Sequence, residues 1–161
     1  MSVCKFDDSK ITWHTVDWLI GFTIFVYNVD EEKRSVDLMI KFEPGEITMM
    51  HQHTADYATI VLEGELRFYD ADREHYETRP AGSYVQGSKD GSPHFEGAGD
   101  ERAIVLFSIR DVEDKVAEFF DDVQGVTHVL GISDFKAVYE EQLENGEIAN
   151  VSARKVAVPT A

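Results

Sequence analysis

The feature that most constrains this chain is a pair of histidines, His51 and His53, which lies between two glycines, Gly45 and Gly64. The segment is rich in β-branched side chains and has turn-forming residues at both ends, a pattern that predicts strand, turn and strand. Side chains in a strand alternate between faces, so both imidazoles point to the same side. Because each can offer a neutral ring nitrogen, the spacing predicts a metal site on one face of a strand.

A third histidine strengthens this prediction. A histidine pair in a strand is a weak signal by itself, since such side chains are commonly part-exposed or hydrogen-bonded. Further along, Gly82 opens another short β-rich segment, and Gly91 lies three positions before His94. The chain therefore brings a third candidate ligand onto a later strand.

These residues resemble the two motifs of the cupin family. The first motif is glycine, five residues, His-x-His and a later glycine, and the second ends in glycine, two residues and histidine. The resemblance covers residues 36–110 and implies an all-β fold, the double-stranded β-helix, a jelly-roll barrel of two facing antiparallel sheets. It also implies that three imidazoles converge on one metal ion and leave positions open for water or substrate. The matching residues are Gly45, His51, His53 and Gly64, then Gly82, Gly91 and His94.

The chain departs from the cupin pattern at the usual acidic ligand. Common cupins carry a glutamate four residues after the second histidine, and this chain has Tyr57 there. Its neighbour Asp56 lies in a predicted turn and is a second candidate to replace the missing carboxylate. Glu96 shares strand parity with His94, so we expect it to face the cavity. The sequence favours a place for Glu96 behind the ligands and leaves open whether it is a fourth ligand.

A three-histidine ion without a carboxylate keeps its full charge and several open positions, which suits a bidentate anionic substrate such as an enolate. The pattern is similar to the cupin branch of acetylacetone-cleaving dioxygenase and 2,4'-dihydroxyacetophenone dioxygenase. This resemblance implies bound Fe(II) and O2-dependent cleavage of the C–C bond next to a carbonyl, in a small diketone or hydroxyketone. Tyr57, Gln86 and Glu96 are then the expected catalytic residues of the pocket.

Two other classes of function stay open on the sequence. The same barrel and histidines would also serve a Zn(II)-binding sensor or regulatory module without catalysis, like the cupin domains of anti-sigma factors. A metal-dependent isomerase or decarboxylase is the other alternative. Imidazole accepts Fe(II), Zn(II), Mn(II) and Ni(II), so the sequence does not choose the metal.

The rest of the chain predicts one domain, residues 1–161, closed by a helix. A chain of 161 residues has the size of one ordinary domain, and its many short β-rich runs predict a barrel or sandwich. Residues 112–146 are expected to form a hairpin and a helix that ends at Asn145 and Gly146. The expected N-cap is Ser133, and the expected apolar stripe is Phe135, Val138, Tyr139 and Leu143.

Charge and composition limit the partners. With 31 acidic against 15 basic residues and a net charge of −16, nucleic acid and anionic membranes are disfavoured, and a small carbonyl substrate with O2 is expected. Cys4 is the only cysteine, so no intrachain disulfide forms. The chain shows neither an apolar signal core nor a run near ~20 apolar residues, which predicts a cytoplasmic location. The aromatic residues within 11–29 predict a homodimer interface.

Overall fold

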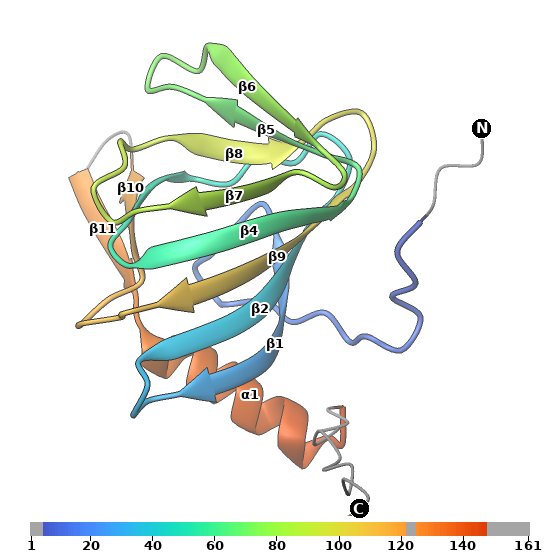
Figure 1. The fold of residues 1–161 in the computed structure, drawn as a ribbon, viewed down its shortest axis with the longest axis vertical. Coiled ribbons are helices and arrows are strands. Elements are labelled where there is room, and N and C mark those ends of the chain that lie inside the picture. The colour runs from blue at the N-terminus through green and yellow to red at the C-terminus, as the bar shows by residue number, and fades with distance from the viewer. Residues whose placement is uncertain (1–4, 122–124, 148–161) are drawn as a thin grey trace, which may run out of the picture.

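The computed structural model describes residues 5–121 and 125–147, in which strands predominate (Figure 1). The strands pair into three sheets, whose orders are β1-β2-β9-β4-β7, β11-β10-β3 and β6-β5-β8. The elements are β1 (Thr23–Asp30), β2 (Ser35–Phe42), β3 (Met50–His53), β4 (Asp56–Glu63), β5 (Glu65–Tyr69), β6 (His75–Pro80), β7 (Tyr84–Gly87), β8 (Phe95–Ala98), β9 (Ala103–Arg110), β10 (Ala117–Asp121), β11 (Gly125–Leu130) and α1 (Ile132–Glu144).

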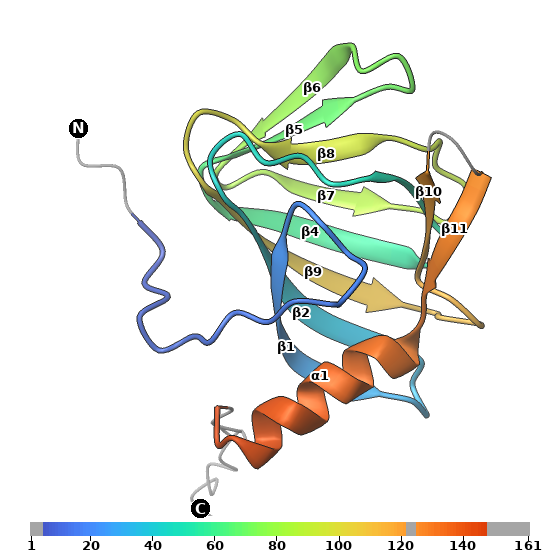
Figure 2. The same cartoon turned by 180° about the vertical axis from the view of Figure 1, so that it is seen from behind.

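The two smaller sheets join into one layer through the histidines themselves. His51 and His94 form an antiparallel bridge in which each N–H donates to the other's carbonyl oxygen, both at 2.9 Å. A second bridge links Ile47 with Gly97. The larger sheet runs from β1 to β7, with β10 and β11 at its side and α1 next to β1 (Figures 1 and 2). This architecture confirms the predicted all-β jelly roll with a C-terminal helix.

The core lies between the two layers, because the inward-facing positions of both are apolar. The larger sheet contributes Leu38 and Val105, and the other layer contributes Leu66 and Phe119. All four side chains are buried. Polar groups that point into this space are therefore removed from water, and they need partners inside the protein.

Two hairpins are present, and the second is the one predicted within residues 112–146. Strands β1 and β2 pair antiparallel, as do β10 and β11, whose connecting residues 122–124 lie outside the described part of the chain. Gly64 joins β4 to β5 with a φ of 69°, in the left-handed region that favours glycine. The turn predicted at Gly64 is thus confirmed.

Helix α1 confirms the predicted element but begins differently. Gly131 is the N-cap, and its N–H donates to the carboxylate of Asp134 at 2.8 Å, so Ser133 is not the cap. The end agrees with the prediction, since Asn145 is the C-cap and Gly146 has a φ of 68°. Within residues 5–121 and 125–147, no helix is long and apolar enough to cross a membrane.

The buried stripe of α1 contains Gln142 where the sequence predicts Leu143, which is 43% exposed. The buried amide of Gln142 accepts a hydrogen bond from the Val26 N–H at 2.9 Å and donates one to the Val26 carbonyl at 3.0 Å. Strand β1 lies at the sheet edge, and its register shifts between Val26 and Asn28. Gln142 thus satisfies backbone groups that a neighbouring strand would otherwise bind.

The N-terminal residues form an extended arm, with one bridge between His14 and Ile24. The arm places Phe6, Ile11 and Trp13 against a small apolar cluster on the larger sheet. This cluster is separate from the main core. The arm therefore covers apolar side chains that would otherwise be exposed to water. The buried members of the cluster are Phe25, Met39 and Ile104.

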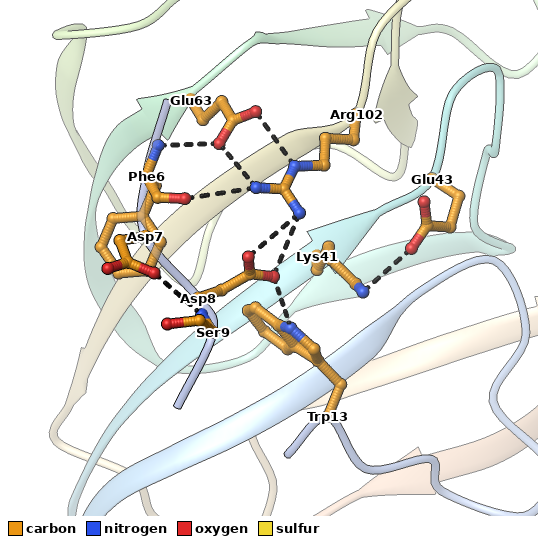
Figure 3. Close-up of polar contacts among 9 residues, drawn as sticks. All are labelled: Phe6, Asp7, Asp8, Ser9, Trp13, Lys41, Glu43, Glu63 and Arg102. Atoms are coloured by element: carbon orange, nitrogen blue, oxygen red, sulfur yellow. Dashed lines mark hydrogen bonds and ion pairs between the residues drawn. The ribbon is translucent and has the colours of Figure 1, made fainter. Parts of the chain in front are cut away.

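A partly buried ion-pair group holds this arm (Figure 3). The guanidinium of Arg102 donates to both carboxylate oxygens of Glu63 at 3.0 Å and to those of Asp8 at 3.1 and 3.2 Å. It also donates to the Phe6 carbonyl at 3.2 Å, and the Phe6 N–H donates back to Glu63 at 2.9 Å. The Trp13 indole donates to Asp8 at 2.9 Å. We call Arg102, Glu63 and Asp8 the arm anchor.

Candidate metal centre

Three histidines and one glutamate form a group inside the barrel. His51 and His53 lie on β3, His94 directly precedes β8, and Glu96 lies on β8. Each side chain offers one ligand atom, and these four atoms all lie within 4.8 Å of one another. The strand alternation expected from the sequence and the His51–His94 backbone bridge together produce this convergence. The chain therefore presents a group able to hold a metal ion.

Backbone hydrogen bonds fix two of the imidazoles for metal binding. Nδ1 of His51 lies 3.0 Å from the Met49 carbonyl oxygen, and Nδ1 of His94 lies 3.0 Å from the Ser92 carbonyl oxygen. A carbonyl only accepts, so each Nδ1 carries the proton and each Nε2 keeps a lone pair. Among the described residues, Nε2 of His94 is buried and has no hydrogen-bond partner. A metal ion would satisfy it.

The carboxylate of Glu96 lies close enough to these nitrogens to share an ion with them. One oxygen is 3.6 Å from Nε2 of His51, and the other is 3.7 Å from Nε2 of His94. Two ligands on opposite sides of one ion, each about 2.1 Å from it, are about 4.2 Å apart, so both separations fit a shared ion. The centre thus has an acidic side chain beside it although position 57 is a tyrosine.

Burial and the charge interactions between Glu96 and the imidazoles together determine the pKa values of the group. It lowers the pKa of His51, and it lowers the pKa of His53 to about 3, so both imidazoles favour the neutral, ligating form. Burial acts the same way on His94, but the Glu96 carboxylate outweighs it and raises the pKa of His94. Burial alone would raise the pKa of Glu96, yet His94 and the other imidazoles lower it to about 2. Glu96 is therefore an anion whose ion-pair partners in the described part of the chain are the imidazoles of His51 and His94.

Tyr57 lies beside the group, as expected for a pocket residue. Its ring centroid is 4.2 Å from that of His53. A side chain on Gly87, which pairs with Tyr57 across β4 and β7, would place Cβ 2.0 Å from the tyrosine ring, so only glycine leaves room for it. Burial raises the pKa of Tyr57 to about 12, which keeps its hydroxyl protonated and able to donate.

Gln86 and Asp56 lie elsewhere. Gln86 is paired with Ala58 and not with Tyr57, so it faces the opposite side of the sheet, where it is exposed. Its amide donates to the Tyr84 hydroxyl at 3.3 Å. Asp56 is exposed and accepts the Lys89 N–H at 3.2 Å. Neither residue belongs to the four-residue group, because strand alternation turns the first outward and the second lies at the start of β4.

The other histidines have partners of their own. His75 is exposed, and its ring bonds the Thr78 hydroxyl at 2.8 Å. His14 lies 2.7 Å from the Glu147 carboxylate. The ring of His128 stacks on Trp18 at 4.6 Å between centroids. All three therefore lie outside the metal group.

A pocket of about 180 Å³ leads to the group, and we call it the mouth. His53 and His94 line its inner end, and Tyr76, which is 55% exposed, lines its rim. Arg79 also lines it, with the guanidinium 4.1 Å above the Phe68 ring. The sequence gives no signal for Arg79 and Tyr76, because β6 carries polar residues at most positions, like an ordinary solvated strand. The mouth combines aromatic walls with one cation.

The comparisons with known proteins agree with this fold. Residues 3–111 match the model of the ChrR cupin-like domain. An acetylacetone dioxygenase from Acinetobacter johnsonii has a similar structure, with a TM-score of 0.66 and 16% identity over 88% of this chain and 92% of that one. An RmlC-like cupin protein from Ralstonia eutropha gives a TM-score of 0.65 and 14% identity, over 96% and 94% of the two chains.

Other similar structures differ in what their names state. The polyketide cyclase RemF from Streptomyces resistomycificus gives a TM-score of 0.52 and 18% identity, over 66% of this chain and 78% of that one. A comparison with curated proteins gave no match. At these identities, the structural likeness establishes the fold alone.

Proposed function

Because the chain belongs to the ChrR cupin-like domain family, we propose that it is a metal-dependent cupin of the non-haem Fe(II) dioxygenase type. Its substrate is a small diketone or hydroxyketone, and the bond cleaved is the C–C bond next to a carbonyl. The observation that carries the metal assignment is the convergence of Nε2 of His51 and His94, each with its Nδ1 bonded to a backbone carbonyl. The dioxygenase assignment is supported by the likeness to acetylacetone dioxygenase.

Charge and ligand number support a bidentate, anionic substrate. Three neutral imidazoles and the Glu96 carboxylate would leave a divalent ion with one net positive charge. An ion that accepts six ligands then keeps two positions for adjacent substrate oxygens. The bound ion would supply two-point substrate binding and activation of O2. If Glu96 stays behind the ligands, a third position is open and the ion with its three neutral imidazoles keeps both positive charges, which still favours an anionic substrate.

The chain's own residues position the substrate. Arg79 in the mouth offers a cation to a negatively charged substrate, and its pair with Glu77 uses Nε and Nη2. The Tyr57 hydroxyl is protonated and offers a hydrogen bond to a substrate oxygen. The ring of Phe68 offers an apolar wall to the carbon skeleton. These groups orient the substrate and limit water near the ion.

The test begins with metal-free protein loaded anaerobically with Fe(II). A panel of β-diketones and hydroxyketones is then added, and a charge-transfer band is expected for the substrate that chelates. Admission of O2 should cause uptake of one O2 per substrate and yield two carbonyl-containing products. Full metal loading with no band and no uptake across the panel would contradict the catalytic proposal. Homodimer formation, tested by light scattering, is a separate expectation.

One observation favours a second candidate, a Zn(II)-binding sensor or regulatory module. Structural zinc sites are closed by four protein ligands, and Glu96 brings the number of donors here to four. Stoichiometric zinc in the purified protein with no O2 uptake after exchange to iron would favour this module. Iron with O2 uptake would favour the enzyme.

A further inference from the structure

A second cavity also reaches the metal group, and it differs in character from the mouth. Its volume is about 30 Å³, and we call it the inner chamber. His51, His53 and Glu96 line one part of it. The remaining lining is apolar and comes from the larger sheet, from β10 and β11 and from helix α1, with Phe107, Ala117, Phe119 and Phe135 among the lining residues.

The inner chamber is suited to an apolar occupant. A cavity needs about 10–15 Å³ to admit a water molecule, so its size alone would admit water. A buried water also needs two to four polar partners. Here the polar lining atoms belong to the imidazoles and the carboxylate, which the metal group already engages. Apolar side chains supply the rest of the wall, and an apolar wall favours a small apolar occupant over water.

Size and polarity separate the chamber from the mouth. The mouth is about 180 Å³ and carries Arg79, Tyr76 and Ser92, so it suits a polar organic molecule. The inner chamber has about one sixth of that volume, which leaves space for a molecule of about two heavy atoms. His53 lines both cavities. Two different ligands can thus approach the same group without competing for one space.

We propose that the inner chamber is a binding site for a small apolar molecule, dioxygen in the reaction proposed above. The choice of dioxygen rests on that proposed function, whereas the existence of the site rests on the cavity alone. Dioxygen is apolar and has two heavy atoms, so it matches the chamber in both respects. A molecule in the inner chamber lies beside His51 and His53, while an organic substrate fills the mouth.

Two variants change the chamber in opposite directions. Ala117 is buried on β10 and lines it, so Ala117→Val fills the space with two additional methyl groups. Ile109→Val removes one methyl group from the lining and enlarges it. Ala58→Val makes the same change as the first variant on the outer face of β4, away from the chamber, and is the matched control.

The first measurement uses xenon, with krypton as a smaller second probe, on zinc-loaded protein. Crystals under gas pressure should show a noble-gas atom beside Ala117 and Phe119, and ¹²⁹Xe spectra should show saturable binding. Ala117→Val should abolish this binding, Ile109→Val should strengthen it, and Ala58→Val should leave it unchanged. Absence of both gases from the wild-type chamber overturns the proposal. If Ala117→Val fails to fold, Ile109→Val still tests the proposal, because stronger noble-gas binding would support it and unchanged or weaker binding would contradict it.

The second measurement identifies the natural occupant. In iron-loaded protein, Ala117→Val should raise the KM for O2 several-fold and leave the KM for the organic substrate unchanged. Noble-gas binding together with an unchanged KM for O2 would overturn the assignment to dioxygen. Failure of the proposed function is distinguishable, since protein that binds metal but never consumes O2 would still bind xenon in the chamber.

Discussion

Glu63 and Glu96 are both buried carboxylates, and they differ in what balances their charge. Glu63, at the end of β4, meets the permanent cation of Arg102, which also binds Asp8. Glu96, on β8, meets imidazoles, two of which burial biases toward the neutral form. Buried charge is costly unless it is paired. The arm anchor is thus complete within the chain, whereas the histidine group is able to hold an external cation.

The difference separates a structural role from a binding role. In the arm anchor, the donors of Arg102 already point at carboxylate or carbonyl oxygens, and the Trp13 indole and Phe6 N–H supply further bonds (Figure 3). In the histidine group, Nε2 of His94 has no hydrogen-bond partner among the described residues. Disruption of the first group should change stability, and disruption of the second should change metal binding.

The largest expected effect is loss of metal binding in His94→Ala. Removal of one of three imidazoles should weaken Zn(II) affinity by more than about 100-fold, because even residues behind the ligands contribute about 10–100-fold. Calorimetric titration of metal-free protein measures this. His75→Ala removes an exposed histidine and is the matched control, with affinity unchanged. Equal affinities of the two variants would contradict the site.

Arg102→Met should have the next largest effect, on stability. It leaves Glu63 buried and without its cation, and we expect a loss of about 2–3 kcal/mol in the free energy of unfolding. Urea denaturation of metal-free protein measures the loss. Arg110→Met, which removes a half-exposed partner of Asp37, should cost much less. Unchanged Zn(II) affinity in both variants would support the purely structural role of the arm anchor, and weaker affinity in Arg102→Met would contradict it.

Glu96→Gln tests whether Glu96 is a fourth metal ligand, a question that the sequence leaves open. The amide keeps the shape but removes the charge, so Zn(II) affinity should fall by about 10-fold. Glu77→Gln is the control, because this carboxylate pairs with Arg79 in the mouth and lies outside the group of four ligand atoms. X-ray absorption at the zinc edge then reports whether an oxygen ligand is lost. An unaltered spectrum would place Glu96 behind the ligands.

The smallest effect is a pH dependence of the arm anchor. The hydrogen bond from Arg102 holds the pKa of Glu63 below its ordinary value. A group with a lowered pKa in the folded state binds fewer protons than in the unfolded state, so its stabilisation is complete above the ordinary pKa and is lost as pH falls. The unfolding free energy should therefore decrease on acidification below about pH 4.5, the ordinary value. Glu63→Gln should flatten this part of the profile relative to wild type.

Local sequence was sufficient to predict a fold of short strands, the C-terminal helix and the three candidate histidine ligands. The alternation around His51 and His53 fixed their shared face, and the glycine spacing up to His94 led to the cupin fold, which the comparisons confirm. The sequence was wrong in placing Gln86 in the pocket. The alternation of a four-residue strand shows which side chains share a face, but it does not reveal which face points inward. The pairing of Gln86 with Ala58 rather than Tyr57 settled that.

The sequence alone was enough to predict short strands with His51 and His53 on one shared face, because strand parity and glycine turns are local properties. The meeting of distant side chains depends on the folded structure. Glu96 approaches the imidazoles, Gln142 bonds the edge of β1, and Arg102 joins Asp8 to Glu63. Each of these contacts depends on strand order and register, which arise from pairing across the whole chain and leave no periodic signal in any one segment.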